Sequence, residues 1–182
     1  MKKNDIILLI IGLILAVISI TYIIYKTFFG DIWAKNADKL NRKICAIDKN
    51  EKYISDLSKY IPFEWDKLYV FNENVQIDRI YDVVGNKWEN INKVTNEGMN
   101  QLVFVKDSKV VCYIYGYPKR KKVSYEFGNL ENNGEYTVFE KGSKLQFDIS
   151  IGKDRIRYLK YVDETTQNVP NETSNDNVLN KE

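Results

Sequence analysis

The sequence predicts an α+β protein in which an N-terminal transmembrane helix precedes amphipathic helices packed on an antiparallel β-meander of about five or six strands. Three observations lead to this class. An uncharged apolar run opens the chain, apolar residues then recur at helical spacing, and after Gly98 the apolar period changes to two. The apolar face of such a sheet must be covered, and the preceding helices are the cover that the sequence offers.

The apolar run covers residues 6–25 and contains no charged side chain. A helix of this length spans about 30 Å, which matches the hydrocarbon layer of a lipid bilayer. Tyr22 and Tyr25 lie where interfacial aromatic residues are expected. The alternative is a cleaved signal peptide, but its apolar stretch is about 7–15 residues long and is followed by a small-x-small site. A lipoprotein is disfavoured because Cys45 lies too far along the chain.

Charges that flank the apolar run predict its orientation. Lys2, Lys3 and the terminal amine favour a cytoplasmic tail at residues 1–5. Lys26 and Lys35 lie on the other flank and weaken this bias. We expect a protein of the cell membrane with a single span, whose chain after Lys26 lies outside the cytoplasm.

Residues 26–62 are predicted to form an amphipathic helical segment, as one bent helix or two short ones. Asp31 is the expected N-cap, and Pro62 ends the helical pattern. The apolar positions lie at spacings of three and four in two stretches. They are Trp33, Ala37, Leu40, Ile44 and Ile47, and then Ile54, Leu57 and Ile61.

Residues 63–162 are predicted to form an extracytoplasmic α+β domain. A short strand at 67–71 precedes a helix at 77–84, for which Asn72 or Asn74 is the expected cap and Gly85 the left-handed end. Alternating segments follow as strands. They are a hairpin at 101–118 with its turn near Asp107 and Ser108, and strands within 121–127, 135–141, 144–151 and 155–162.

Residues 163–182 contain five acidic side chains and one lysine, with almost no apolar residue. Such a composition cannot bury enough apolar surface to fold, so we expect a disordered acidic tail.

The composition excludes several classes of chemistry. There is no histidine, so catalytic triads, Cys-His dyads and most zinc or copper sites are not expected. Cys45 and Cys112 are too few for a thiolate metal site, and the free thiols are favoured over a disulfide. We therefore expect no cofactor, no metal and no enzymatic activity. The net charge of +2 is too small to indicate a nucleic-acid partner.

The stretch "YIPFEWDKLYVF" allows two interpretations. In the functional one, Glu64 and Asp66 are an acid–base pair with Trp65 as a platform for a sugar ring. In the structural one, which we favour, aromatic residues fill the junction between helix and sheet. The motif residues are then Phe63, Trp65, Asp66, Tyr69 and Phe71.

The same stretch carries a resemblance. "PFEWDKLYVF", followed by a short segment ending in "VVG" and by a Trp three residues on, resembles uncharacterised membrane-anchored envelope proteins of bacteria with a WD-x-[LV]-Y-[VI]-F motif. The similarity covers Phe63 to about Trp88. A Pro-Tyr pair often follows the strand in that group, whereas "NENV" stands here. The resemblance implies an anchor and a β-meander, and no assigned activity.

Two features are candidates for binding. Tyr113, Tyr115 and Tyr117 alternate with core-like residues and are predicted to form an aromatic row on the outer face of the sheet. The row suits a glycan or a protein partner, and cross-strand packing is the alternative. Cations of a predicted hairpin turn suit anionic lipid or anionic wall polymer, and a solvated turn is the alternative. They are Lys119, Arg120, Lys121 and Lys122.

These features favour a binding or assembly module of the bacterial cell envelope, held in the bilayer by residues 6–25. Its expected partner is an envelope protein or an anionic wall polymer. Two alternatives stay open, a membrane-anchored immunity or inhibitor protein and a cofactor-free hydrolase of envelope glycans. The hydrolase requires two carboxylates about 5–10 Å apart in an open cleft.

Overall fold

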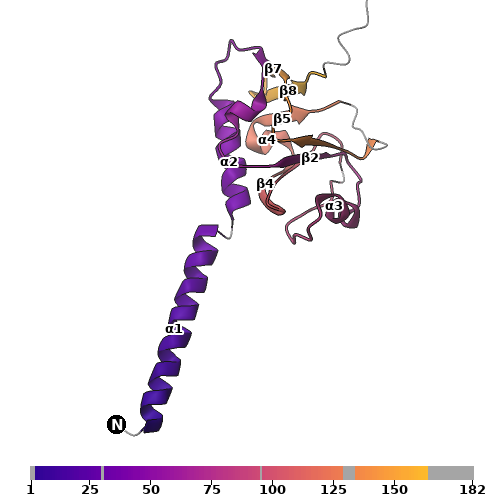
Figure 1. Cartoon of the computed structure of the whole chain (residues 1–182). Coiled ribbons are helices and arrows are strands. Elements are labelled where there is room, and N and C mark those ends of the chain that lie inside the picture. Colours follow the sequence, from indigo (N-terminus) through magenta and orange to yellow (C-terminus); the bar gives the residue numbers. More distant parts are fainter. Residues whose placement is uncertain (1–2, 30, 95, 129–133, 164–182) are drawn as a thin grey trace, which may run out of the picture.

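A computed structural model describes residues 3–29, 31–94, 96–128 and 134–163 of the chain (Figure 1). It confirms the α+β class, with an N-terminal apolar helix and two sheets of four strands each. The predicted single meander of five or six strands is wrong. The predicted disordered tail, apart from Asp163, lies outside the described residues, as do the first two residues of the chain.

The first helix, α1, runs from Lys3 to Phe29. Its segment Asn4–Tyr25, 22 residues long, is apolar enough to cross a membrane, and none of it is buried inside the structure. A signal sequence near an N-terminus has the same properties. Figure 1 shows α1 extending away from the domain, so its apolar side chains have no cover from the described part of the protein.

The second helix, α2, spans Ile32–Cys45 and is separated from α1 by two residues. Asp31 is at the N-cap position, as predicted, although its side chain makes no capping hydrogen bond. The backbone carbonyl of Asp31 instead accepts from the N–H groups of Ala34 and Lys35, both at 3.1 Å. The predicted stripe is the buried face of the helix, to which Asn36 and Asn41 also belong.

The predicted helix at residues 54–61 is wrong. Strand β1 is Tyr53–Ile54, and a single 3₁₀ turn, η1, follows at Leu57–Tyr60. Asp56 caps this turn by accepting from the N–H of Ser58 at 2.9 Å. Ile54 and Leu57 are nevertheless both buried, because a strand followed by one tight turn can bury two residues at the spacing of a helix.

One sheet, the antiparallel sheet, has the strand order β4-β3-β2-β6. Its strands are β2 (Lys67–Phe71), β3 (Asn100–Lys106), β4 (Lys109–Gly116) and β6 (Tyr136–Glu140). The turn between β3 and β4 is at Asp107 and Ser108 as predicted, with φ values of +47° and +58°. A two-residue turn with both φ angles positive matches the twist of a hairpin.

The other sheet, the mixed sheet, has the order β1-β7-β8-β5. Its further strands are β5 (Val123–Glu126), β7 (Phe147–Ile151) and β8 (Arg157–Tyr161). β5 pairs parallel with β8, and the other pairs are antiparallel. The short helix α4 (Pro118–Lys121) carries the chain from the antiparallel sheet to the mixed sheet, where sequence alternation alone predicted a hairpin turn.

The antiparallel sheet is buried on both faces. One face packs on the mixed sheet through fully buried side chains such as Phe104 and Phe147. The other face packs on helix α3 (Ile77–Val84) through Ile80 and Val84. Gly85 ends α3 with φ +74° as predicted, but the N-cap is Gln76 and neither Asn72 nor Asn74.

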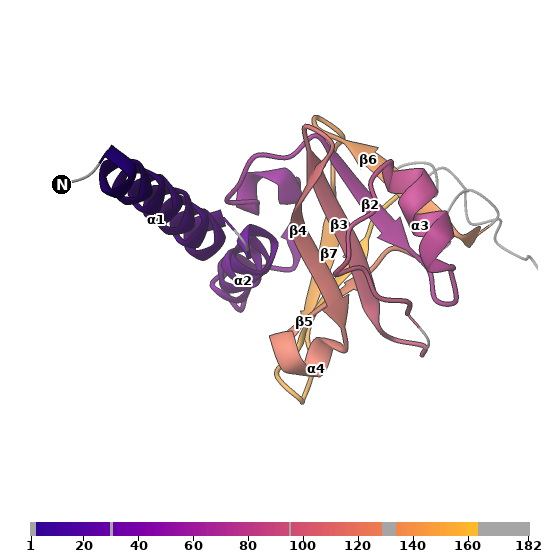
Figure 2. The ribbon, with the colours of Figure 1, turned by 90° about the horizontal axis from the view of Figure 1, so that it is seen from below.

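Helix α2 packs against the edge strand β4 (Figure 2). Ala37 and Leu40 pack into the core between the sheets, whereas Trp33 packs on the opposite face of the antiparallel sheet. The side-chain amide of Asn36 donates to the carbonyl oxygen of Val111 at 2.9 Å. The helix thus shields an edge that would otherwise offer unpaired backbone groups to another strand.

Candidate binding cavity beside helix α2

The aromatic residues of the "FEWDKLYVF" stretch lie on both faces of the antiparallel sheet. Trp65 is 3% exposed and meets the ring of Phe104 edge-on at 5.8 Å. Phe63 meets Phe104 in the same way at 5.4 Å. Tyr69 and Phe71 stack on the other face with ring centroids 6.2 Å apart. This placement favours the structural interpretation of the motif, because the Trp65 ring is buried and cannot serve as an open platform for a sugar ring.

The two acidic residues of the stretch form separate ion pairs. Glu64 accepts from the Lys141 ammonium at 2.6 Å, and Asp66 accepts from Lys106 at 2.9 Å and from the N–H of Asp107 at 2.9 Å. These bonds lower the pKa of both carboxyls below the usual range. Both groups therefore remain ionised at neutral pH, which counts against either as the general acid of a hydrolase.

Asp66→Asn tests the role of this ion pair through the pH dependence of stability. A carboxyl whose pKa is lowered by folding stabilises the folded state above its unfolded pKa, about 3.9 for aspartate, and this stabilisation is lost as the pH falls through the folded pKa. We expect the variant to have a lower Tm than the wild type at pH 7. The difference should be smaller at about pH 3 than at pH 7, because at the lower pH the unfolded state already binds the proton that the folded state resists.

Glu51→Gln is the matched control, since Glu51 is an exposed carboxylate of the loop before β1. Thermal unfolding is followed by near-ultraviolet circular dichroism at both pH values. A Tm difference for Asp66→Asn that is equal at the two pH values, or no larger than that of the control, contradicts the assigned role.

The three tyrosines of the predicted outer row are not equally open. Tyr113 is 4% exposed, Tyr115 is half-buried, and Tyr117 is 48% exposed. Cys112 and Ile114 point into the core between the sheets, as predicted. The row is not an open surface because a second hydrophobic cluster, to which α3 contributes, covers this face of the sheet.

Two tryptophans complete this cover. Trp33 from α2 and Trp88 from the chain after α3 meet edge-on at 5.1 Å, and the Tyr113 ring lies 6.2 Å from Trp33 and 5.3 Å from Trp88. Tyr115 stacks on Tyr113 at 5.7 Å. The outer tyrosine row therefore ends in a cluster of four rings contributed by three segments that are distant in the sequence.

Hydrogen bonds hold the segment around Asn92 against this cluster. The Asn92 N–H donates to the Tyr113 hydroxyl at 3.0 Å, and Gln101 donates to the Asn92 carbonyl oxygen at 2.7 Å. The Tyr115 hydroxyl donates to the carbonyl oxygen of Lys93 at 3.0 Å. Burial raises the pKa of Tyr113 to about 12, so this hydroxyl stays neutral. The four rings and the segment around Asn92 are therefore joined by ring contacts and hydrogen bonds.

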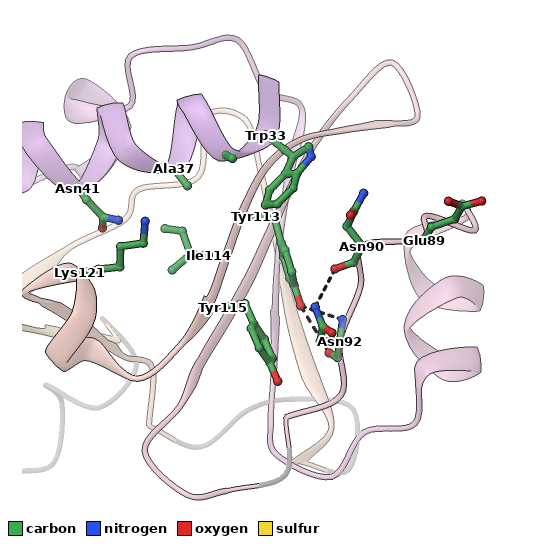
Figure 3. Close-up of a pocket in the computed structure, with 11 residues that line it drawn as sticks. Trp33, Ala37, Asn41, Glu89, Asn90, Asn92, Tyr113, Ile114, Tyr115 and Lys121 are labelled. Carbon is green, nitrogen blue, oxygen red and sulfur yellow. Dashed lines mark hydrogen bonds between the residues drawn. The ribbon is translucent and has the colours of Figure 1, made fainter. Parts of the chain in front are cut away.

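A cavity of about 330 Å³ lies between α2, β4 and this segment (Figure 3). We call it the aromatic cavity. Its volume falls at the lower end of the range of small-molecule sites, about 300–1,000 Å³. The lining residues are Trp33, Ala34, Ala37, Asn41, Glu89, Asn90, Asn92, Tyr113, Ile114, Tyr115 and Lys121.

A second hollow of about 350 Å³, the basic groove, lies between α2 and α4. It shares Asn41 and Lys121 with the aromatic cavity. Its lining residues are Asp38, Asn41, Arg42, Cys45, Arg120 and Lys121. The basic groove is thus lined by three cations and one carboxylate, and it adjoins the aromatic cavity at Asn41 and Lys121.

The cations predicted on a hairpin turn lie on and next to α4. Lys121 pairs with Asp38 of α2 at 2.6 Å, which ties α4 to α2. Lys122 ends the helix with φ +60°. Lys119 and Arg120 are exposed. The structure therefore brings Tyr113, Tyr115 and one cation of the predicted set into a single cavity, and leaves Tyr117 and Lys119 outside its lining.

Cys45 and Cys112 are both free thiols, as favoured from the sequence. Cys45 is exposed at the end of α2, and Cys112 is buried, where burial raises the pKa of its thiol. A thiol with a raised pKa is a poor nucleophile. Among the residues that the structure describes, no group of three or more His, Cys, Asp or Glu side chains could hold a metal ion.

Sequence reasoning assigned Trp33 to the core stripe and gave Asn41 and Asn92 no role. Asn41 is next to Leu40 in the sequence and one helical turn from Ala37. A polar residue so close to the predicted apolar face was the feature from which a buried amide could have been predicted. Comparisons of the chain with models of protein families, with curated proteins and with solved structures gave no match.

Proposed function

We propose that this protein is a single-pass membrane protein of the cell envelope whose domain binds a partner outside the cytoplasm, and that it is not an enzyme. The observation that carries the proposal is the uncovered apolar helix. From Asn4 to Tyr25 none of α1 is buried, yet the helix is joined through two residues to a folded domain. Apolar surface of that extent is unfavourable in water and favourable in lipid.

A binding role is supported by the aromatic cavity, because it offers rings, amides and a cationic end without a recognisable catalytic pair. The two carboxylates considered for a hydrolase, Glu64 and Asp66, are each held by a lysine. The basic residues Lys2 and Lys3 support a cytoplasmic N-terminus and hence an exterior domain.

The proposal is tested by photo-crosslinking in the native envelope. A photoreactive phenylalanine replaces Tyr117, which is 48% exposed beside α4. We expect crosslinked adducts with an envelope protein or polymer. Tyr53, which is 40% exposed on β1 of the mixed sheet, is the matched control position and should give fewer adducts. Adducts only with copies of the protein itself, or equal adducts at both positions, contradict the proposed binding role.

A further inference from the structure

The side chain of Asn41 is buried, and the described part of the protein gives it no hydrogen-bond partner. The side chain is on the face of α2 that is turned to the domain, it is 6% exposed, and neither its amide nitrogen nor its amide oxygen is hydrogen-bonded within the described residues. A buried donor or acceptor left unpaired costs about 1–3 kcal/mol. Figure 3 shows the amide at one end of the aromatic cavity, beside Lys121, so a molecule bound there could pair with both atoms.

We propose that the aromatic cavity and the basic groove together bind a saccharide unit that carries a carboxylate or phosphate group. The sugar ring packs against Trp33 and Tyr115, its hydroxyls pair with Asn41, and its anionic group lies beside Arg42 and Arg120. This inference names the ligand class for the proposed function and rests on it only for the location of the domain outside the cytoplasm.

The aromatic end suits the ring of a sugar. The faces of aromatic rings carry partial negative charge, and the C–H groups of a pyranose carry partial positive charge. An amide both donates and accepts, as neighbouring sugar hydroxyls do, and three asparagines are among the lining residues, Asn41, Asn90 and Asn92. The Asn92 amide already donates to the carbonyl oxygen of Asn90 at 2.9 Å, so Asn41 is the amide that needs a partner. The indole N–H of Trp33 is a further buried donor without a partner among the described residues.

The basic end suits an anionic group. Lys121 is paired with Asp38, but Arg42 and Arg120 form no ion pair with any described residue. The planar guanidinium group of arginine matches two oxygens of a carboxylate or phosphate at once. Because both arginines lie beside Asn41, one bound molecule can contact the arginines and the unpaired amide.

The geometry argues against two other occupants. An extended peptide would add to the edge of β4, but α2 packs against that edge and the Asn36 amide already donates to the carbonyl oxygen of Val111. A lipid headgroup would be nearest the junction of α1 and α2. Arg42 lies ten residues beyond Ile32 on the same helix, about 15 Å along its axis.

The test uses full-length protein in a polyoxyethylene detergent, which carries no sugar headgroup. The probes are trigalacturonate, the neutral trisaccharide galactotriose and inorganic phosphate, measured by calorimetry and by tryptophan fluorescence. We expect trigalacturonate to bind with a Kd below about 1 mM and galactotriose to bind at least about tenfold more weakly. Inorganic phosphate alone should bind more weakly than trigalacturonate, because it does not reach the aromatic end.

Asn41→Leu separates a binding role from a structural one. The substitution replaces the unpaired amide with an apolar group of the same branching, which fills part of the cavity, so the Tm should stay the same or rise. Binding of trigalacturonate should weaken at least about tenfold. Arg120→Gln should weaken the binding of trigalacturonate and leave the binding of galactotriose unchanged. Lys153→Gln, at an exposed cation in the turn between β7 and β8, is the matched control and should change neither.

The proposal is overturned if trigalacturonate does not bind, if galactotriose binds equally well, or if Asn41→Leu lowers the Tm and leaves binding intact. A fluorescence response that appears only in nanodiscs with anionic lipid would identify a lipid headgroup as the occupant and overturn it as well. All of these measurements use purified protein, so a negative result would not bear on where the domain lies in the cell. Conversely, evidence that the domain lies in the cytoplasm would not bear on whether it binds a saccharide.

Discussion

Phe104→Ala is expected to lower the free energy of unfolding by about 3–5 kcal/mol. Phe104 is fully buried at the centre of the core between the two sheets, where it contacts the rings of Phe63 and Trp65. Both rings come from the segment directly before β2, where the Asp66 N–H donates to the Val105 carbonyl oxygen at 2.7 Å, so this segment is fixed beside the space that the substitution leaves. Because the stability of a domain is usually about 5–15 kcal/mol, this loss would leave the protein near its unfolding threshold.

The loss is measured by urea unfolding of the full-length protein in mild detergent. Ile151→Ala is the matched control, because Ile151 is an apolar residue at the end of β7 that is 39% exposed, and it should cost less than about 1 kcal/mol. A loss for Phe104→Ala as small as that of the control would show that the two sheets do not enclose this ring.

Deletion of residues 2–29 is expected to release the protein from membranes. Each Leu, Ile or Val near the middle of a membrane helix favours insertion by about 0.3–0.6 kcal/mol, and α1 consists largely of these residues. Their sum is several kcal/mol, which corresponds to at least about a 100-fold change in partition. Full-length protein should stay in the membrane pellet after alkaline carbonate extraction, and the shortened protein should be in the supernatant.

A chain in which residues 6–25 are replaced by leucines and alanines is the control, and it should remain in the pellet if apolarity alone is responsible. The mass of the membrane-bound protein decides between an anchor and a cleaved signal peptide. An intact N-terminus supports the anchor. Loss of the N-terminal segment from the mature protein, or full-length protein in the soluble fraction, would contradict it.

The elements with strong local periodicity could be predicted from the sequence. The β3–β4 hairpin, its turn at Asp107 and Ser108, and the left-handed end of α3 at Gly85 all follow from patterns within a few residues, and the structure confirms them. The stripe on α2 was also correct, because four apolar residues at helical spacing over three turns have few other solutions. By contrast, the short stretch from Ile54 to Ile61 fitted a helix and a strand with a 3₁₀ turn equally well.

The packing of segments that are distant in the sequence could not be predicted from the sequence. The parallel pairing of β5 with β8 joins segments that share no local pattern, so alternation predicted a meander. The tyrosine row was predicted to be open because alternation gives the side of a sheet and not what covers it. Trp33 and Trp88, which cover it, come from distant segments. The aromatic cavity, with Asn41 at one end, exists only where these segments meet α2.

The proposed function depends most on the location of the domain outside the cytoplasm, which labelling of Cys45 measures most directly. Cys45 is exposed and Cys112 is buried, so a membrane-impermeant maleimide should react with Cys45 alone in the folded protein. Intact cells whose wall admits the reagent are treated, with Cys45→Ser as the control. We expect Cys45 to be labelled in intact cells as completely as in lysed cells. Labelling that appears only after lysis would contradict this location.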